Sequence, residues 1–132
     1  MLFVPGNRAA WMEKAAHYGA DCLILDLEDS VPDQEKVAAR PLVKAAIVAL
    51  KARGQAVEVR VNPYASGLTL DDLEGILCPE LDGVRLSKVE TVADMKELDA
   101  LLTHLEKRMG IAPGTIETPL ACETAKAMRD IY

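Results

Sequence analysis

The sequence predicts an α/β protein of the (β/α)8 barrel class, the TIM barrel, of which these 132 residues cover about the first five βα units. Short apolar runs alternate with longer helical patterns, which is typical of a parallel sheet with helices outside it. The apolar runs end near positions 4, 28, 61, 87 and 122, a spacing close to the ~30 residues of a βα unit. No Gly-x-Gly-x-x-Gly follows the first run, so the fingerprint of a dinucleotide-binding doubly wound sheet is missing.

The first two predicted strands are separated by one short helix. The first strand is expected at Leu2–Val4. Asn7 is expected to cap a helix that runs to about Tyr18 and ends at Gly19. The next apolar run, Cys22–Leu27, is typical of a buried strand.

A long Ala-rich pattern follows the second strand. It predicts a helix over Gln34–Arg53 that ends at Gly54. Pro41 falls inside this pattern and is expected to kink or split the helix, because proline lacks the backbone donor that the helix needs. The third strand is expected at Val57–Val61.

The second half of the chain repeats the alternation. The expected helices and strands are a helix Leu70–Leu77 capped by Thr69, a strand Gly83–Leu86, a helix Val92–Met109 capped by Thr91, a strand Thr115–Cys122 and a helix Ala125–Tyr132. We therefore expect residues 1–132 to be the N-terminal part of a single barrel domain. A closed barrel takes roughly 200 residues or more, so the remaining units are expected outside this sequence.

Composition limits the classes of function. Half of the residues are hydrophobic and 27% are charged, as in globular proteins that are not embedded in a membrane. The net charge of −6 disfavours binding to nucleic acid, and no apolar run approaches the ~18 residues of a membrane span. The cysteines Cys22, Cys78 and Cys122 are odd in number and unpaired in spacing, which favours reduced thiols and a cytoplasmic protein.

Polar residues gather where the predicted strands end, which is where parallel βα proteins carry their chemistry. Six residues lie at or just after the strand ends: Arg8, Glu28, Asp29, Arg60, Lys88 and Glu123. Asp26 lies inside the second strand. Asp26 and Glu28 share one face of their strand, so at least one carboxylate is expected to point into the barrel mouth.

Buried carboxylates need partners. Arg60, Lys88, Arg8 or a metal ion are the available ones, and a hard divalent cation such as Mg²⁺ suits a site of few carboxylates. The lack of nearby His and Cys argues against zinc. Three structural interpretations stay open. Asp29 and Ser30 can cap the loop after the second strand, Arg60 can form a structural ion pair, and Lys88 can be a solvated loop lysine.

Five segments resemble, in the same order along the chain, the citrate lyase β-subunit-like proteins of the HpcH/HpaI aldolase and citrate lyase family. The segments are Leu2–Arg8 (LFVPGNR), Leu25–Pro32 (LDLEDSVP) with Glu35-Lys36 and Ala39-Arg40 behind it, Val59–Pro63 (VRVNP), Gly83–Glu90 (GVRLSKVE) and Pro119–Ala125 (PLACETA). The resemblance covers the whole chain.

The resemblance implies a trimeric or hexameric TIM barrel that binds Mg²⁺. Such proteins cleave or form a carbon–carbon bond in a 3-hydroxyacyl-CoA, such as citryl-, malyl- or citramalyl-CoA, to give an acyl-CoA and a 2-oxo acid. By position, Glu123 matches a metal-ligand glutamate, Arg60 the arginine that binds the oxo-acid carboxylate, and Glu28 with Asp29 the acidic pair beneath the metal. Lys88 matches the lysine of a Leu-Pro-Lys motif.

The chain departs from the family pattern in two places. Ser87 stands where the family usually has proline, and Pro41 interrupts a helix that normally runs through. The resemblance also implies a second metal ligand, an aspartate after a sixth strand, beyond Tyr132.

Two other functions are compatible with these residues. One is an aldolase that acts on free 2-oxo acids without CoA, although such proteins tend to have histidine where this chain has Asp29. The other is a non-catalytic homologue that binds CoA or a similar ligand. Among the lyase roles, Arg60, Asp29 and Glu28 are the expected catalytic residues. Arg60, Glu123, Lys88 and Arg8 are the expected substrate contacts, and Glu123 is the expected metal ligand.

Overall fold

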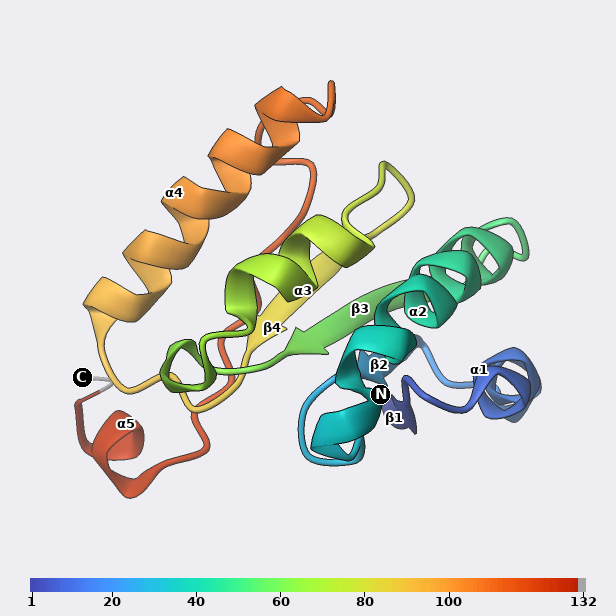
Figure 1. Ribbon diagram of the computed structural model, residues 1–132, viewed down its shortest axis with the longest axis horizontal. Helices are drawn as coiled ribbons and strands as arrows, with labels where there is room; N and C mark the ends of the chain where they lie inside the picture. Colours follow the sequence, from blue (N-terminus) through green and yellow to red (C-terminus); the bar gives the residue numbers. More distant parts are fainter. Residues whose placement is uncertain (131–132) are drawn as a thin grey trace.

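The computed structural model describes residues 1–130 as one parallel sheet with helices along it. The strands are β1 (Leu2–Pro5), β2 (Cys22–Asp26), β3 (Ala56–Val61) and β4 (Gly83–Leu86), which pair in the order β1-β2-β3-β4. The helices are α1 (Ala9–Ala15), α2 (Lys36–Lys51), α3 (Thr69–Ile76), α4 (Val92–Arg108) and α5 (Ala125–Asp130). Short 3₁₀ turns lie at Ala16–Tyr18, Asp33–Glu35 and Tyr64–Ser66. Figure 1 shows α1 to α4 following one another along the sheet in chain order.

The two faces of the sheet differ in chemistry. One face is apolar and packs under the helices; its strand residues include Leu25, Val59 and Val84, all fully buried. The other face carries charged residues, because side chains alternate along each strand. The parallel register places Asp26 beside Arg60 on this second face, so their pairing is set by the sheet itself.

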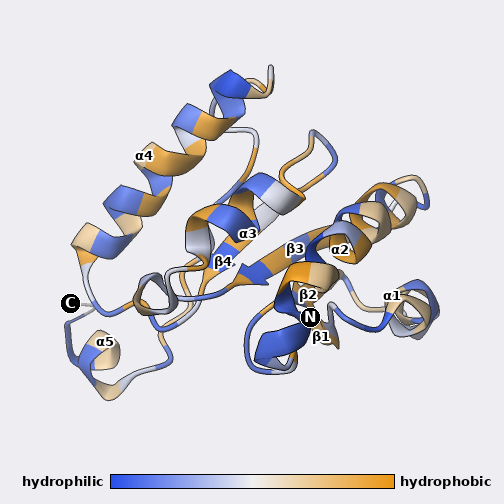
Figure 2. Ribbon diagram, in the orientation of Figure 1, coloured by the Kyte–Doolittle hydropathy of each residue, from blue (hydrophilic) through white to orange (hydrophobic). Residues whose placement is uncertain are grey.

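Helix α4 illustrates how the helices cover the apolar face. Leu98, Leu102 and Leu105 recur at helical spacing and are buried against the core. Figure 2 shows the resulting stripes of hydrophobic and hydrophilic residues along α4. Thr91 caps the helix as predicted, because its side chain accepts a hydrogen bond from the backbone N–H of Asp94 and the Asp94 carboxylate accepts one from the backbone N–H of Thr91.

Two predicted caps are wrong, because tertiary partners take their side chains. The Asn7 amide donates to Glu35 instead of capping α1, whose first residue is preceded by Arg8. Thr69 is the first residue of α3, and its hydroxyl donates to the carbonyl of Asn62.

Pro41 does not split α2, which is continuous from Lys36 to Lys51. Pro41 is the sixth residue of this helix, where it removes one backbone donor while the turns on both sides stay helical. The predicted split at Pro41 is therefore wrong, and the predicted kink stays a prediction.

The predicted fifth strand, Thr115–Cys122, is reduced to a single parallel bridge between Gly83 and Glu117. Pro119 has no backbone N–H and its ring lies 3.4 Å from where a Cβ on Gly83 would stand. A proline at this position ends the pairing with β4. The helix predicted at Ala125–Tyr132 is present as α5, and its last two residues lie outside the described part of the chain.

No helix within residues 1–130 combines the length and the apolar composition that a membrane span requires.

Candidate functional site

The centre of the candidate site is an ion pair between Arg60 on β3 and Asp26 on β2. The Arg60 Nε lies 2.7 Å from Asp26 Oδ1, and its Nη2 lies 2.8 Å from Asp26 Oδ2. Both side chains are nearly buried, with 13% and 2% of their surface exposed. Two parallel charge-assisted hydrogen bonds hold the guanidinium plane in one orientation.

Asp26 is held from its other side as well. Its carboxylate accepts hydrogen bonds from the backbone N–H of Glu28 at 2.9 Å and of Ser30 at 3.0 Å, and from the Ser30 hydroxyl at 2.5 Å. Burial by itself raises the pKa of Asp26, but the bonds from Arg60, Ser30 and Glu28 outweigh it and lower the pKa to about 2. Asp26 therefore stays ionised and anchors both Arg60 and the turn after β2.

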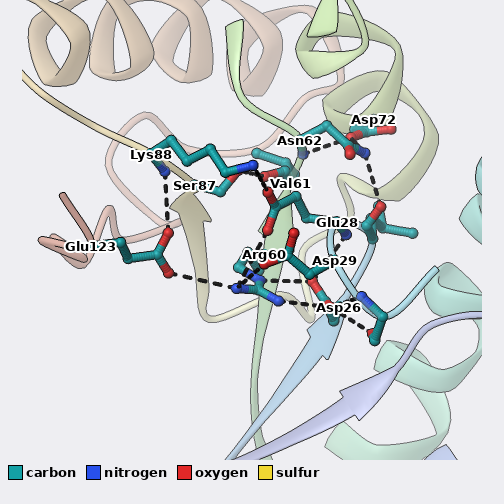
Figure 3. Close-up of polar contacts among 12 residues, drawn as sticks. Asp26, Glu28, Asp29, Arg60, Val61, Asn62, Asp72, Ser87, Lys88 and Glu123 are labelled. Atoms are coloured by element: carbon teal, nitrogen blue, oxygen red, sulfur yellow. Dashed lines mark hydrogen bonds and ion pairs between the residues drawn. The ribbon is translucent and has the colours of Figure 1, made fainter. Parts of the chain in front are cut away.

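The free end of Arg60 faces three more carboxylates. Its Nη1 lies 3.4 Å from Glu28, 3.5 Å from Glu123 and 3.7 Å from Asp29. Figure 3 shows these carboxylates around the guanidinium. The hydrogen bonding that Arg60 donates to Asp26 is the main cause that raises the pKa of Arg60, and the nearby carboxylates add to it. The aromatic ring of Phe3 lies 5.0 Å from Arg60 Cζ and covers one face of the guanidinium.

Lys88 connects two of these carboxylates. Its Nζ lies 2.9 Å from Glu28 Oε1, and its backbone N–H donates to Glu123 Oε2 at 3.2 Å. The φ of 55° at Lys88 is in the left-handed region, which is uncommon for a residue with a side chain and occurs often at functional sites. The hydrogen bond to Glu28 also raises the pKa of the Lys88 ammonium.

Glu28 and Asp29 differ in their surroundings. Glu28 is buried, with 4% of its side chain exposed, and its Oε2 has no hydrogen-bond partner. Asp29 is 68% exposed and lies at the rim. The acidic pair expected from the sequence thus consists of one buried carboxylate, Glu28, and one solvent-facing carboxylate, Asp29.

Arg8 is the predicted site residue that the structure does not bring into the cluster. It precedes α1 and is exposed, and among residues 1–130 it has no ion pair or side-chain hydrogen bond. The other predicted residues, Glu28, Asp29, Arg60, Lys88 and Glu123, lie together.

A second layer of buried polar groups supports the ends of β2 and β3. The Asn62 amide donates to the Leu27 carbonyl at 2.9 Å and to Asp72 at 2.7 Å. Asp72 is in turn paired with Arg40 at 2.9 Å. The ammonium of Lys36 donates to the carbonyls of Leu27 and Glu28.

Sequence reasoning did not assign roles to Asp26, Asp72 or this second layer. A usable signal existed for Asp26, because it is the last residue of β2 and lies on the face that alternation along the strand shares with Glu28. No comparable signal marked Asp72, which lies in α3 and reaches Asn62 only through the fold.

The arrangement fits a divalent cation by charge. Four carboxylates and two cationic side chains meet here, which leaves two formal negative charges without a partner. Within residues 1–130, no three His, Cys, Asp or Glu side chains converge as a complete metal-binding group. Mg²⁺ is commonly held by one or two carboxylates with water and substrate oxygens, so Glu123 and the Glu28 Oε2, which accepts no hydrogen bond, suit this mode.

The Nε–Nη2 fork of Arg60 is occupied by Asp26. A substrate carboxylate can meet only the outer Nη1 end, between Glu28 and Glu123. Both carboxylates repel an anion that approaches this end of Arg60, and a cation bound beside them would offset that repulsion.

The comparisons with known proteins agree with the motifs. A family model described as HpcH/HpaI aldolase/citrate lyase matches residues 1–132. The citrate lyase subunit beta of Leuconostoc mesenteroides subsp. cremoris is 38% identical over 125 residues, which is 95% of this chain and 41% of the relative. An L-malyl-CoA/beta-methylmalyl-CoA lyase of Cereibacter sphaeroides is 37% identical over 112 residues, or 83% of this chain and 35% of the relative. The chain thus spans less than half the length of these curated relatives.

Solved structures show the same fold. A CitE structure from Mycobacterium tuberculosis, complexed with the triphosphate group of ATP, matches with a TM-score of 0.67 and 26% identity, over 98% of this chain and 49% of that one. A malate synthase from Haloferax volcanii, in a pyruvate/acetyl-CoA ternary complex, matches with a TM-score of 0.84, 96% of this chain and 40% of that one. Its sequence identity is 17%, so this second likeness concerns the fold alone.

Proposed function

The chain belongs to the HpcH/HpaI aldolase/citrate lyase family, and on this premise we propose that the full-length protein is a Mg²⁺-dependent carbon–carbon lyase. Its substrate class is a 3-hydroxyacyl-CoA such as citryl-, malyl- or citramalyl-CoA, which it cleaves into an acyl-CoA and a 2-oxo acid, or forms from them. We further propose that residues 1–132 are part of a (β/α)8 barrel that assembles as a homotrimer or hexamer in the cytoplasm.

One observation carries this proposal: a firmly held arginine whose outer end faces an excess of carboxylates. Arg60 is fixed by Asp26, and its Nη1 lies within 3.7 Å of Glu28, Asp29 and Glu123. Cleavage next to a carbonyl releases a 2-oxo acid and leaves an enolate, so the site must bind a carboxylate and stabilise negative charge.

Each predicted residue then has a role. Glu123 is the proposed direct metal ligand, and the ion supplies Lewis-acid polarisation of the substrate's hydroxyl and carbonyl oxygens. The outer end of Arg60 binds the carboxylate of the oxo acid. The buried Glu28 carboxylate pairs with Arg60 and Lys88 and holds these two cations in place.

Asp29 is the proposed base for the substrate hydroxyl proton, because it is the most exposed carboxylate beside Arg60. Lys88 and the exposed Arg8 are proposed to contact anionic parts of the substrate at the rim. A further carboxylate ligand of the metal is expected from a later strand.

A coupled assay for acetyl-CoA release from malyl-CoA or citryl-CoA, with Mg²⁺ and the full-length protein, tests the proposal. Turnover that depends on Mg²⁺ is the expected result. A protein that cleaves 4-hydroxy-2-oxo acids but none of the thioesters would be an aldolase without CoA. A protein that binds CoA thioesters without turning them over would be a non-catalytic homologue.

A further inference from the structure

Lys36, the first residue of α2, is a buried cation that the proposed chemistry does not use. Only 6% of the residue is exposed. Its Nζ donates to the backbone carbonyl of Leu27 at 2.9 Å and of Glu28 at 2.7 Å. Within residues 1–130, no carboxylate lies at ion-pairing distance from it. An ammonium is thus placed beneath the end of β2, held there by carbonyl groups alone.

These carbonyls do not depend on Lys36 for hydrogen bonds. The Leu27 carbonyl also accepts from the Asn62 amide at 2.9 Å, and the Glu28 carbonyl accepts from the Val31 N–H at 3.2 Å. Burying an ammonium without a carboxylate carries a desolvation cost. Stability alone therefore gives no reason for a lysine here.

The position of Lys36 relative to the site does give a reason. The residue whose carbonyl it binds, Glu28, carries the side chain that pairs with Lys88 and lies beside Arg60. A groove at the strand ends is lined by Lys36 together with Glu28, Asp29, Asn62 and Lys88.

The same helix holds the neighbouring strand end. Arg40 lies one turn after Lys36 on the same face of α2, since residues four apart are neighbours on a helix. It binds Asp72, which accepts hydrogen bonds from the backbone and side chain of Asn62 after β3. Two cations of α2 thus act on the ends of the two strands that carry the site.

We propose that Lys36 is a positioning residue: its buried ammonium fixes the turn after β2, so that Glu28 stays directed at Lys88 and Arg60. This inference rests on the proposed function for its effect on catalysis, and on the hydrogen bonds above for its effect on the turn.

The test compares Lys36→Met with a matched control in the full-length protein. Ile47→Ala is the control, because Ile47 is fully buried in the same helix, three turns from the strand ends. Two quantities are measured: kcat and KM for malyl-CoA or citryl-CoA, and hydrogen exchange of the Glu28 and Ser30 amides, which donate to Asp26. Lys36→Gln, which keeps an amide donor on a shorter stem, replaces Lys36→Met if that variant yields too little folded protein.

The expected result for Lys36→Met is a kcat about 10- to 100-fold lower with a smaller change in KM, and faster exchange at Glu28 and Ser30. Ile47→Ala is expected to keep the kcat of the parent protein and normal exchange at these two amides relative to the rest of the chain. Lys36→Arg, which keeps the charge, should recover part of the kcat.

Equal kcat values in Lys36→Met and Ile47→Ala would overturn the proposal. If the parent protein turns over no thioester, the proposed function fails and hydrogen exchange decides. Faster exchange confined to the turn after β2 in Lys36→Met then supports the positioning role, and unchanged exchange overturns it.

Discussion

Replacing Asp26 with asparagine tests whether the buried pair with Arg60 anchors the site. Asparagine keeps the shape and one acceptor but removes the charge that faces Nε and Nη2 of Arg60. Removing one partner of a buried pair costs ~3–5 kcal/mol, and we expect the lower end because Glu28 and Glu123 remain near the guanidinium.

The pH dependence of this effect follows from the pKa of Asp26. That pKa lies near 2 instead of 3.8, which corresponds to about 2 kcal/mol of stability at neutral pH. Because the folded-state pKa is the lower one, this stability is present above pH ~4 and is lost as the pH falls toward 2, with about half lost by pH 3. The other carboxylates are the same in the parent protein and in Asp26→Asn, so their contributions to the pH dependence of unfolding largely cancel when the two are compared.

The assay is urea unfolding of the full-length protein, followed by circular dichroism at pH 7, 5, 4 and 3 with fixed ionic strength and protein concentration. Asp26→Asn should be about 3 kcal/mol less stable than the parent protein at pH 7. This gap, the difference between their free energies of unfolding, should narrow by about 1 kcal/mol by pH 3. Asp29→Asn is the control; its side chain is 68% exposed, so a change within about 0.5 kcal/mol is expected. A gap below about 0.5 kcal/mol for Asp26→Asn, or one that does not vary with pH, would refute this reasoning.

Two further predictions concern the rim of the site. Glu123→Gln should lower kcat/KM on the order of 100-fold. In a Mg²⁺ titration after chelation, the variant should show no response to the added ion. The free energy of unfolding should change by less than about 1 kcal/mol, because a third of the Glu123 side chain is exposed. Retention of the Mg²⁺ response would exclude Glu123 as the metal ligand. Lys88→Gly should keep the left-handed backbone and the hydrogen bond from the backbone N–H at this position to Glu123. Lys88→Val should have a free energy of unfolding about 1 kcal/mol lower than that of Lys88→Gly, because a β-branched residue resists a φ of 55°. Equal urea midpoints for these two variants would show that the backbone conformation of Lys88 carries no strain.

Much of the fold could be predicted because it depends on local patterns. The strands at Leu2–Pro5, Cys22–Asp26, Ala56–Val61 and Gly83–Leu86 follow from short apolar runs between turn residues. The capping box at Thr91 was predictable for the same reason, since both of its hydrogen bonds join residues three apart.

The two wrong caps arose where a group distant in the sequence binds a side chain that the local pattern would place at a helix start. Asn7 and Thr69 have the composition of caps, but Glu35 and the Asn62 carbonyl bind their side chains. The fifth strand failed for a different reason: its apolar pattern is strong, but Pro119 lacks the donor that a ladder needs.

For the candidate site, the sequence by itself determined that carboxylates and cations collect at the strand ends, because parallel strands bring those ends to one edge. Only the tertiary structure decided how they pair. The register of β2 and β3 sets Asp26 beside Arg60, which uses the guanidinium fork and leaves Nη1 to Glu28 and Glu123. Charge pairing depends on separations of a few ångströms between strands. The alternation along one strand determines which face each side chain takes, but not which residue of the neighbouring strand lies beside it.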